Sequence, residues 1–75
     1  MTQNNQKVHA YLLIEVWDRE ITYKQFATFE EAQKEMKGKF PTLLDEDNAS
    51  ESELGEFYAW INGDYAYDAK IIQVA

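Results

Sequence analysis

The chain has 75 residues and no cysteine, so we expect one small domain that neither disulfides nor a thiolate zinc site stabilises. Its net charge of −7 disfavours direct contact with nucleic acid and with anionic lipid surfaces. The apolar run 10–14 is too short to cross a bilayer, and no signal-peptide cleavage pattern follows it. We therefore expect a cytoplasmic domain over residues 1–75, without membrane contact and with a flexible N-terminus at residues 1–7.

Two strands are predicted near the N-terminus. Apolar residues recur there at every second position, which is the period of a strand with one buried face, at Val8, Ala10, Leu12, Ile14 and Val16. A second short strand follows in the segment ITYKQF. An even loop over WDRE would pair Val16 with Ile21 or Tyr23 and keep the faces matched. We expect a hairpin whose Leu12, Ile14 and Val16 side chains enter the core.

The segment from Thr28 to Phe40 predicts an amphipathic helix. Thr28 and Glu31 have the spacing of a capping box, and one apolar stripe follows at Phe29, Ala32, Met36 and Phe40. Gly38 suits a left-handed cap, and Pro41 is expected to end the helix. A helix start of this type recurs in many small bacterial and phage domains, and it covers too little of the chain to indicate a family.

A second hairpin is predicted over residues 56–74. Asn62-Gly63 lies between two aromatic runs, and this dipeptide is a strong hairpin signal because both residues of such a turn adopt positive φ. The resulting register would place Trp60 opposite Tyr65 and Tyr58 opposite Tyr67 in one cluster of rings. The last strand is apolar on both faces at Ile71, Ile72 and Val74, which is typical of a central strand.

These elements predict an α+β domain with the order ββαββ. Two hairpins would form a four-stranded sheet with strand order 2-1-4-3, and one amphipathic helix would pack on one face. The expected core contains Leu12, Ile14, Val16, Phe29, Met36, Phe40, Ile71 and several of the C-terminal aromatic residues. One helix covers only one face of such a sheet, so the other face must meet water, a partner or a second copy.

The connection 42–55 concentrates the acidic charge of the chain. Residues 1–44 hold six acids and six bases, whereas residues 45–75 hold eight acids and only Lys70. We expect a solvated loop here, with an electrostatic contact site for a basic partner as the alternative. A calcium loop starting at Asp45 fails at its fifth and sixth positions, which are Ala49 and Ser50. We expect no metal and no cofactor.

The sequence favours a small non-enzymatic module that contacts a protein partner, and the acidic half of the chain favours a basic partner. The predicted contact residues are the carboxylates Asp45, Glu46, Asp47, Glu51, Glu53 and Glu56 and the rings of Trp17, Tyr58, Trp60, Tyr65 and Tyr67. The expected state is a monomer, or at most a weak homodimer through the sheet, because like charges repel. The exposed rings would provide the apolar contact, and these carboxylates would steer a basic partner toward the domain.

Two other functions stay open. The acidic surface could mimic nucleic acid and block a nucleic-acid-binding protein, as inhibitors encoded by phages or mobile elements do. His9, the sole histidine, could instead act with a carboxylate in a small enzyme or ligand-binding domain. No partner for a catalytic histidine can be named from the sequence, so we expect no catalytic residues.

Overall fold

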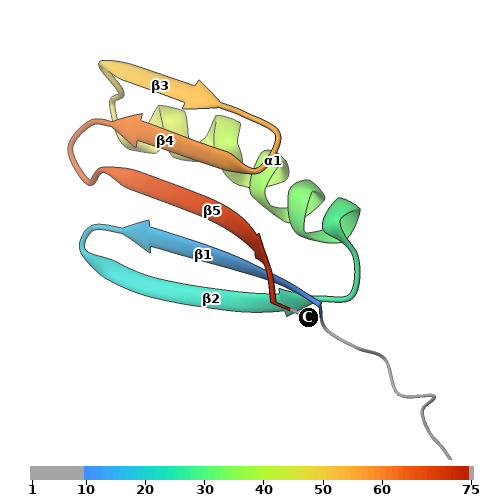
Figure 1. Ribbon diagram of the computed structural model, residues 1–75. Coiled ribbons are helices and arrows are strands. Elements are labelled where there is room, and N and C mark those ends of the chain that lie inside the picture. The colour runs from blue at the N-terminus through green and yellow to red at the C-terminus, as the bar shows by residue number, and fades with distance from the viewer. Residues whose placement is uncertain (1–9, 75) are drawn as a thin grey trace, which may run out of the picture.

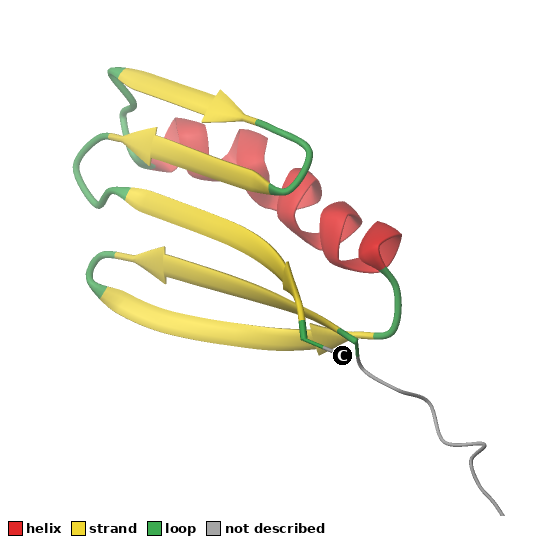
Figure 2. Ribbon diagram, in the orientation of Figure 1, coloured by secondary structure: helices red, strands yellow, loops and turns green. Residues whose placement is uncertain are grey.

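The computed structural model describes residues 10–74 as one helix on a five-stranded antiparallel sheet. The elements are β1 (Tyr11–Trp17), β2 (Glu20–Phe26), α1 (Phe29–Glu46), β3 (Glu51–Leu54), β4 (Tyr58–Asn62) and β5 (Tyr67–Gln73). The sheet order is β2-β1-β5-β4-β3. The helix α1 crosses one face of the sheet, and no other element of the described residues covers the opposite face (Figures 1 and 2). The α+β class and the single helix are confirmed.

The prediction of four strands was wrong, because a fifth strand forms within the acidic segment. Glu51–Leu54 pairs with β4 and becomes the edge strand β3. The relative order of the four predicted strands is confirmed, since β1 and β5 lie inside the sheet beside each other. Most of residues 42–55 therefore belongs to the end of α1 and to β3. The loop between these two elements is much shorter than predicted.

The first hairpin forms with Val16 opposite Ile21, as one of the two predicted registers requires. Its buried face, however, is the reverse of the prediction. Leu13 and Glu15 are buried against the helix, whereas Leu12, Ile14 and Val16 lie on the open face and are only half-buried. The period of two was correct, but both faces of β1 are rich in large side chains, and polarity alone assigned Glu15 to the wrong face.

The core lies between the sheet and α1. Met36 and Phe40 are buried in it as predicted, and so is Ile71; Phe29 packs against it while half-buried. The buried core cluster is completed by Leu13, Ala32, Ala59, Ile61, Tyr67 and Ala69.

The helix begins as predicted and ends later. Thr28 accepts from the backbone N–H of Glu31, and the Glu31 side chain accepts from the backbone N–H of Thr28. The helix then continues through Pro41 to Glu46. Proline inside a helix costs about 3 kcal/mol, and the burial of Leu43 and Leu44 against the core offsets this cost. Gly38 lies within the helix and has no positive φ.

The second hairpin has a longer turn than predicted. Ile61 lies opposite Tyr67, and Trp60 lies opposite Asp68, so five residues, 62–66, lie between the last paired residues instead of two. Gly63 has a negative φ, whereas Ala66 has a φ of 63°. A side chain at Gly63 would collide with Asp47. Gly63 is therefore needed where the turn lies against Asp47 at the end of α1. The predicted cluster of Tyr58, Trp60, Tyr65 and Tyr67 does not form, because the register differs.

Candidate functional site

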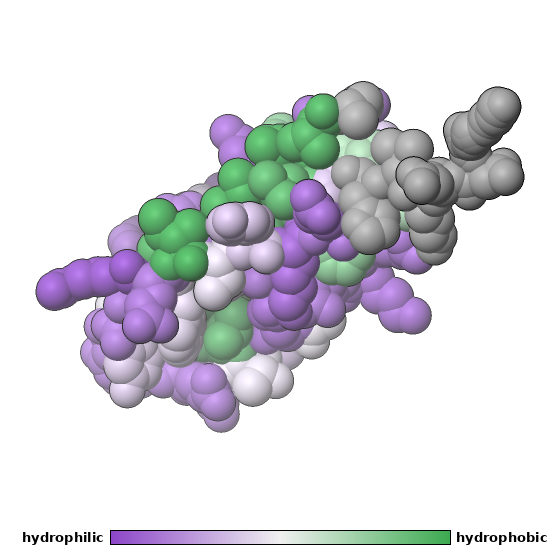
Figure 3. Space-filling model, turned by 90° about the horizontal axis from the view of Figure 1, so that it is seen from below, coloured by the Kyte–Doolittle hydropathy of each residue, from purple (hydrophilic) through white to green (hydrophobic). Residues whose placement is uncertain are grey.

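The face of the sheet opposite α1 is the candidate site, and we call it the open face. The strand pairing places one residue in two from every strand on it. Ile21 and Tyr23 on β2 are 67% and 68% exposed. Beside them Leu12, Ile14 and Val16 on β1 are half-buried and reach the surface. The result is an apolar area over β2 and β1, and Figure 3, which views the molecule from the β2 side, shows hydrophobic side chains in a row on the surface.

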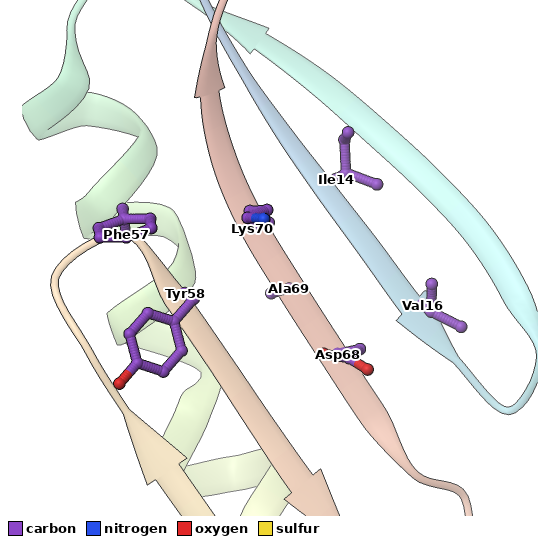
Figure 4. A pocket seen from close by; sticks show the side chains of 7 residues that line it. All are labelled: Ile14, Val16, Phe57, Tyr58, Asp68, Ala69 and Lys70. Carbon is purple, nitrogen blue, oxygen red and sulfur yellow. The ribbon is translucent and has the colours of Figure 1, made fainter.

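A shallow groove of about 490 Å³ runs across the middle of the open face. Ile14 and Val16 line it from β1, and Tyr58 at the start of β4 and Phe57 just before that strand line the opposite side (Figure 4). The floor is β5, with Asp68, Ala69 and Lys70. The groove therefore offers apolar walls and one charge of each sign at its floor, an arrangement that suits apolar side chains flanked by charged groups.

The open face changes from apolar to acidic across the sheet. The pairing places Glu51 opposite Asn62 and Glu53 opposite Trp60, so both carboxylates lie on the same face as Trp60. The Tyr58 hydroxyl donates to Glu53 over 2.6 Å, which positions the tyrosine ring beside the groove. That hydrogen bond raises the pKa of Tyr58. A partner would meet apolar side chains at β1 and β2 and carboxylates at β3.

The five predicted contact rings do not share one surface. Tyr58 and Trp60 lie on the open face. Tyr67 is buried under the helix. Trp17 packs against Tyr65 and Tyr67 with centroid distances of 5.2 Å and 6.2 Å, so these three rings form a structural cluster at one end of the sheet.

The six predicted contact carboxylates are also divided. Asp45 and Glu46 lie exposed at the end of α1, and Glu51 and Glu53 lie exposed on β3. Glu56 is exposed, but its side chain accepts from the Gln33 amide over 2.9 Å on the helix side. Asp47 is fully buried. The acidic segment therefore does not form one solvated rim, and of its carboxylates only Glu51 and Glu53 on β3 add charge to the open face.

Asp47 is a structural residue that joins the helix end to the β4–β5 turn. Its carboxylate accepts from the backbone N–H groups of Tyr65 and Ala66, and its carbonyl accepts from Asp64 N–H over 2.9 Å. The prediction that this carboxylate contacts a partner was wrong. The sequence signal that could have identified it is its position in the helical register, seven residues after Phe40 on the buried stripe.

A second buried carboxylate, Glu15, is also fully used inside the domain. The Tyr67 hydroxyl donates to Glu15 Oε2 over 2.7 Å, and Lys39 Nζ lies 3.0 Å from Oε1. Lys39 also lies 3.4 Å from Glu35, which forms a 2.7 Å ion pair with Lys24. These pairs tie α1 to β1, β2 and β5. Both carboxylate oxygens of Glu15 have a partner, so the cluster holds the helix against the sheet.

Burial and the hydrogen bond to Glu15 raise the pKa of Tyr67 well above its ordinary value. The folded protein therefore holds this proton more tightly than the unfolded chain. The stability from this group is fully present below about pH 10 and is lost as the pH rises toward the folded-state pKa. We expect the free energy of unfolding, measured in urea, to fall between pH 9 and pH 11, and to fall less in Tyr67→Phe. The exposed control Tyr65→Phe should retain the wild-type decline; an equal decline in Tyr67→Phe would contradict the assignment.

Other kinds of site find no support in the part of the chain that the structure describes. Within residues 10–74, no group of three or more histidine, cysteine, aspartate or glutamate side chains could hold a metal ion. Over the same residues, no helix is long and apolar enough to span a membrane. His9 and the predicted flexible residues 1–7 lie outside the described residues.

Comparison of the chain with known protein families, with curated proteins and with solved structures finds no match. Only the open face therefore points to a function. Sequence reasoning missed most of its apolar residues, because Ile14 and Val16 were assigned to the core and Ile21 and Tyr23 were not assigned to a contact site.

Proposed function

We propose that the protein is a non-enzymatic interaction module that binds a protein partner through the open face. The observation that supports this most is the apolar area on the face that α1 leaves uncovered, where Ile21 and Tyr23 are each about two-thirds exposed. Contiguous apolar surface of this kind usually marks a contact site in a small monomeric domain. The groove beside it provides a place for the partner's apolar side chains.

The charge on the open face indicates the chemistry of the partner. Glu51 and Glu53 border the face at β3, and the whole chain carries a charge of −7. A partner with an apolar centre and basic residues on the side that meets β3 would complement both areas. Rim charges mainly steer the encounter, and they are screened over about 8–10 Å at physiological salt. We expect binding to weaken as salt is raised.

The rival functions have less support. A nucleic-acid mimic needs carboxylates arranged along one surface, whereas Asp47 is buried and Glu56 is bonded on the helix side. For an enzyme, the buried carboxylates of the described chain are already occupied: Glu15 by Lys39 and Tyr67, and Asp47 by backbone donors.

The double substitution Ile14→Thr with Val16→Thr tests the open face. Threonine keeps the branched shape that strands favour and adds hydroxyl groups to the groove wall. We expect partner binding to weaken by at least about tenfold, since each replaced side chain removes about 1 kcal/mol or more of apolar contact. Pull-down of host proteins with the wild type and the variant, quantified by mass spectrometry, measures the loss.

The matched control is Lys34→Thr on the exposed side of α1. It should leave binding unchanged, and both variants should retain a wild-type thermal unfolding profile near neutral pH. Equal recovery of all host proteins by the wild type and by the double variant Ile14→Thr with Val16→Thr would contradict the proposal.

A further inference from the structure

A separate surface of interest is the outer edge of β2. Among the elements of residues 10–74 this strand pairs with β1 alone, and six of its seven residues are exposed. In Figure 1 it lies at the opposite side of the sheet from β3. An edge strand presents a row of backbone N–H and C=O groups that another strand can pair with. At seven residues, β2 is longer than the other edge strand, which has four.

The β1–β2 turn determines which backbone groups point outward. It consists of Asp18 and Arg19, both with positive φ, so Trp17 and Glu20 flank a two-residue loop. Residues that flank such a loop exchange both hydrogen bonds, and bonded and non-bonded pairs then alternate along the strands. The backbone groups of Thr22 and Lys24 therefore point toward β1, and those of Ile21, Tyr23 and Gln25 point out of the sheet.

We propose that β2 pairs antiparallel with β2 of a second copy of this chain, around a two-fold axis at Thr22. In this register Ile21 lies opposite the second copy's Tyr23, and their outward backbone groups exchange hydrogen bonds. Glu20 lies opposite Lys24 in the adjacent pair, where opposite side chains come closest. The strand is thus self-complementary in its hydrogen bonds, in its apolar side chains and in its charges.

The charge of the whole domain favours this edge over any other contact between copies. The eight acids of residues 45–75 lie in the end of α1, in β3 to β5 and in their turns, whereas the β1–β2 turn and β2 carry two acids and two bases: Asp18, Arg19, Glu20 and Lys24. Joining the two β2 edges would form a ten-stranded sheet with both acidic β3 edges at its outer ends. Repulsion between copies is then smallest. The open face would also continue across the junction through Ile21 and Tyr23.

Charge reversal at the paired positions provides the test. Sedimentation velocity over a concentration series should show reversible dimerisation of the wild type. E20K and K24E should each weaken it by at least about tenfold, because both cross-strand charge pairs of the dimer become repulsive. An equal mixture of E20K and K24E should dimerise again, since the reversed residues face each other with opposite charge. Lys34→Glu makes the same charge change as K24E, but on the exposed side of α1. This control should dimerise like the wild type.

Lys24 also forms the ion pair with Glu35, so K24E disturbs its own chain as well. E20K leaves that pair intact and tests the register by itself if K24E fails to fold. A wild type that stays monomeric at millimolar concentration would overturn the proposal, and so would an E20K variant that dimerises as well as the wild type. Because Ile14 and Val16 lie on β1, away from the β2 edge, loss of dimerisation and loss of partner binding can be told apart.

Discussion

Replacing Asp47 by alanine is expected to lower the free energy of unfolding by about 3 kcal/mol. The substitution leaves the N–H groups of Tyr65 and Ala66 without the carboxylate that accepts from them. Hydrogen bonds to a charged group contribute about 1.5–3 kcal/mol each, and buried donors left without a partner cost further free energy. A domain of this size has on the order of 5 kcal/mol in total, so the variant should be largely destabilised.

Urea denaturation of Asp47→Ala and of the matched control Asp45→Ala measures this effect. Asp45 is exposed in the last turn of the same helix, so its loss should change the free energy of unfolding by less than about 0.5 kcal/mol. Similar urea midpoints for the two variants would show that Asp47 is a solvated residue and that the turn does not depend on it.

Replacing Lys39 by methionine should produce a loss of similar size. Lys39 is the only cation within ion-pair distance of Glu15 in the described chain, at 2.9 Å, and Glu15 is 5% exposed. Removing one partner of a buried ion pair leaves an uncompensated charge, at a cost of about 3 kcal/mol or more. We expect the melting temperature of Lys39→Met to fall by more than that of any substitution on the exposed side of α1.

The double variant Glu15→Leu with Lys39→Met distinguishes charge burial from lost packing. Replacing both charged groups by apolar ones is often neutral or stabilising, although the Tyr67 hydroxyl then loses its acceptor. The double variant should recover most of the stability that Lys39→Met loses. Equal instability of the single and double variants would contradict this explanation, because the loss would then arise from packing.

Local signals predicted the parts of the fold that depend on local chemistry. The capping box at Thr28 and Glu31 identified the start of α1, and alternation identified β1 and its partner. The end of α1 depends on a tertiary contact instead. Leu43 and Leu44 continue the buried stripe past Pro41, and their burial outweighs a local rule that ends helices at proline.

The face of β1 could not be predicted from polarity, because its only charged residue points inward. Glu15 is compatible with the core because Lys39 and Tyr67 come from α1 and β5 to meet it. Both partners are distant in sequence, so no local pattern marks them. This single reversal moved Ile14 and Val16 from the predicted core to the open face. It explains why the sequence placed only Tyr58 and Trp60 of that face among the predicted contact residues and missed its apolar part.

The acidic segment was wrongly predicted to be a loop, because a high density of charge describes only the composition of a segment. Whether the segment forms a strand depends on the strand beside it. Glu51–Leu54 becomes a strand because β4 offers a free edge to it, and Asp47 is buried because Gly63 leaves room for it. These contacts need the folded sheet. The acidic character of β3 nevertheless remains part of the candidate site, which the charge asymmetry of the sequence did indicate.

Site-specific crosslinking in the native host is the measurement that tests the proposed function most directly. A photoreactive phenylalanine in place of Tyr58 places the probe beside the groove on the open face, and the same probe in place of Lys34 lies on the exposed side of α1. We expect the probe at position 58 to crosslink one defined host protein, with basic residues near the attachment point, and the probe at position 34 not to. Crosslinking of that protein from position 34 alone would contradict binding through the open face.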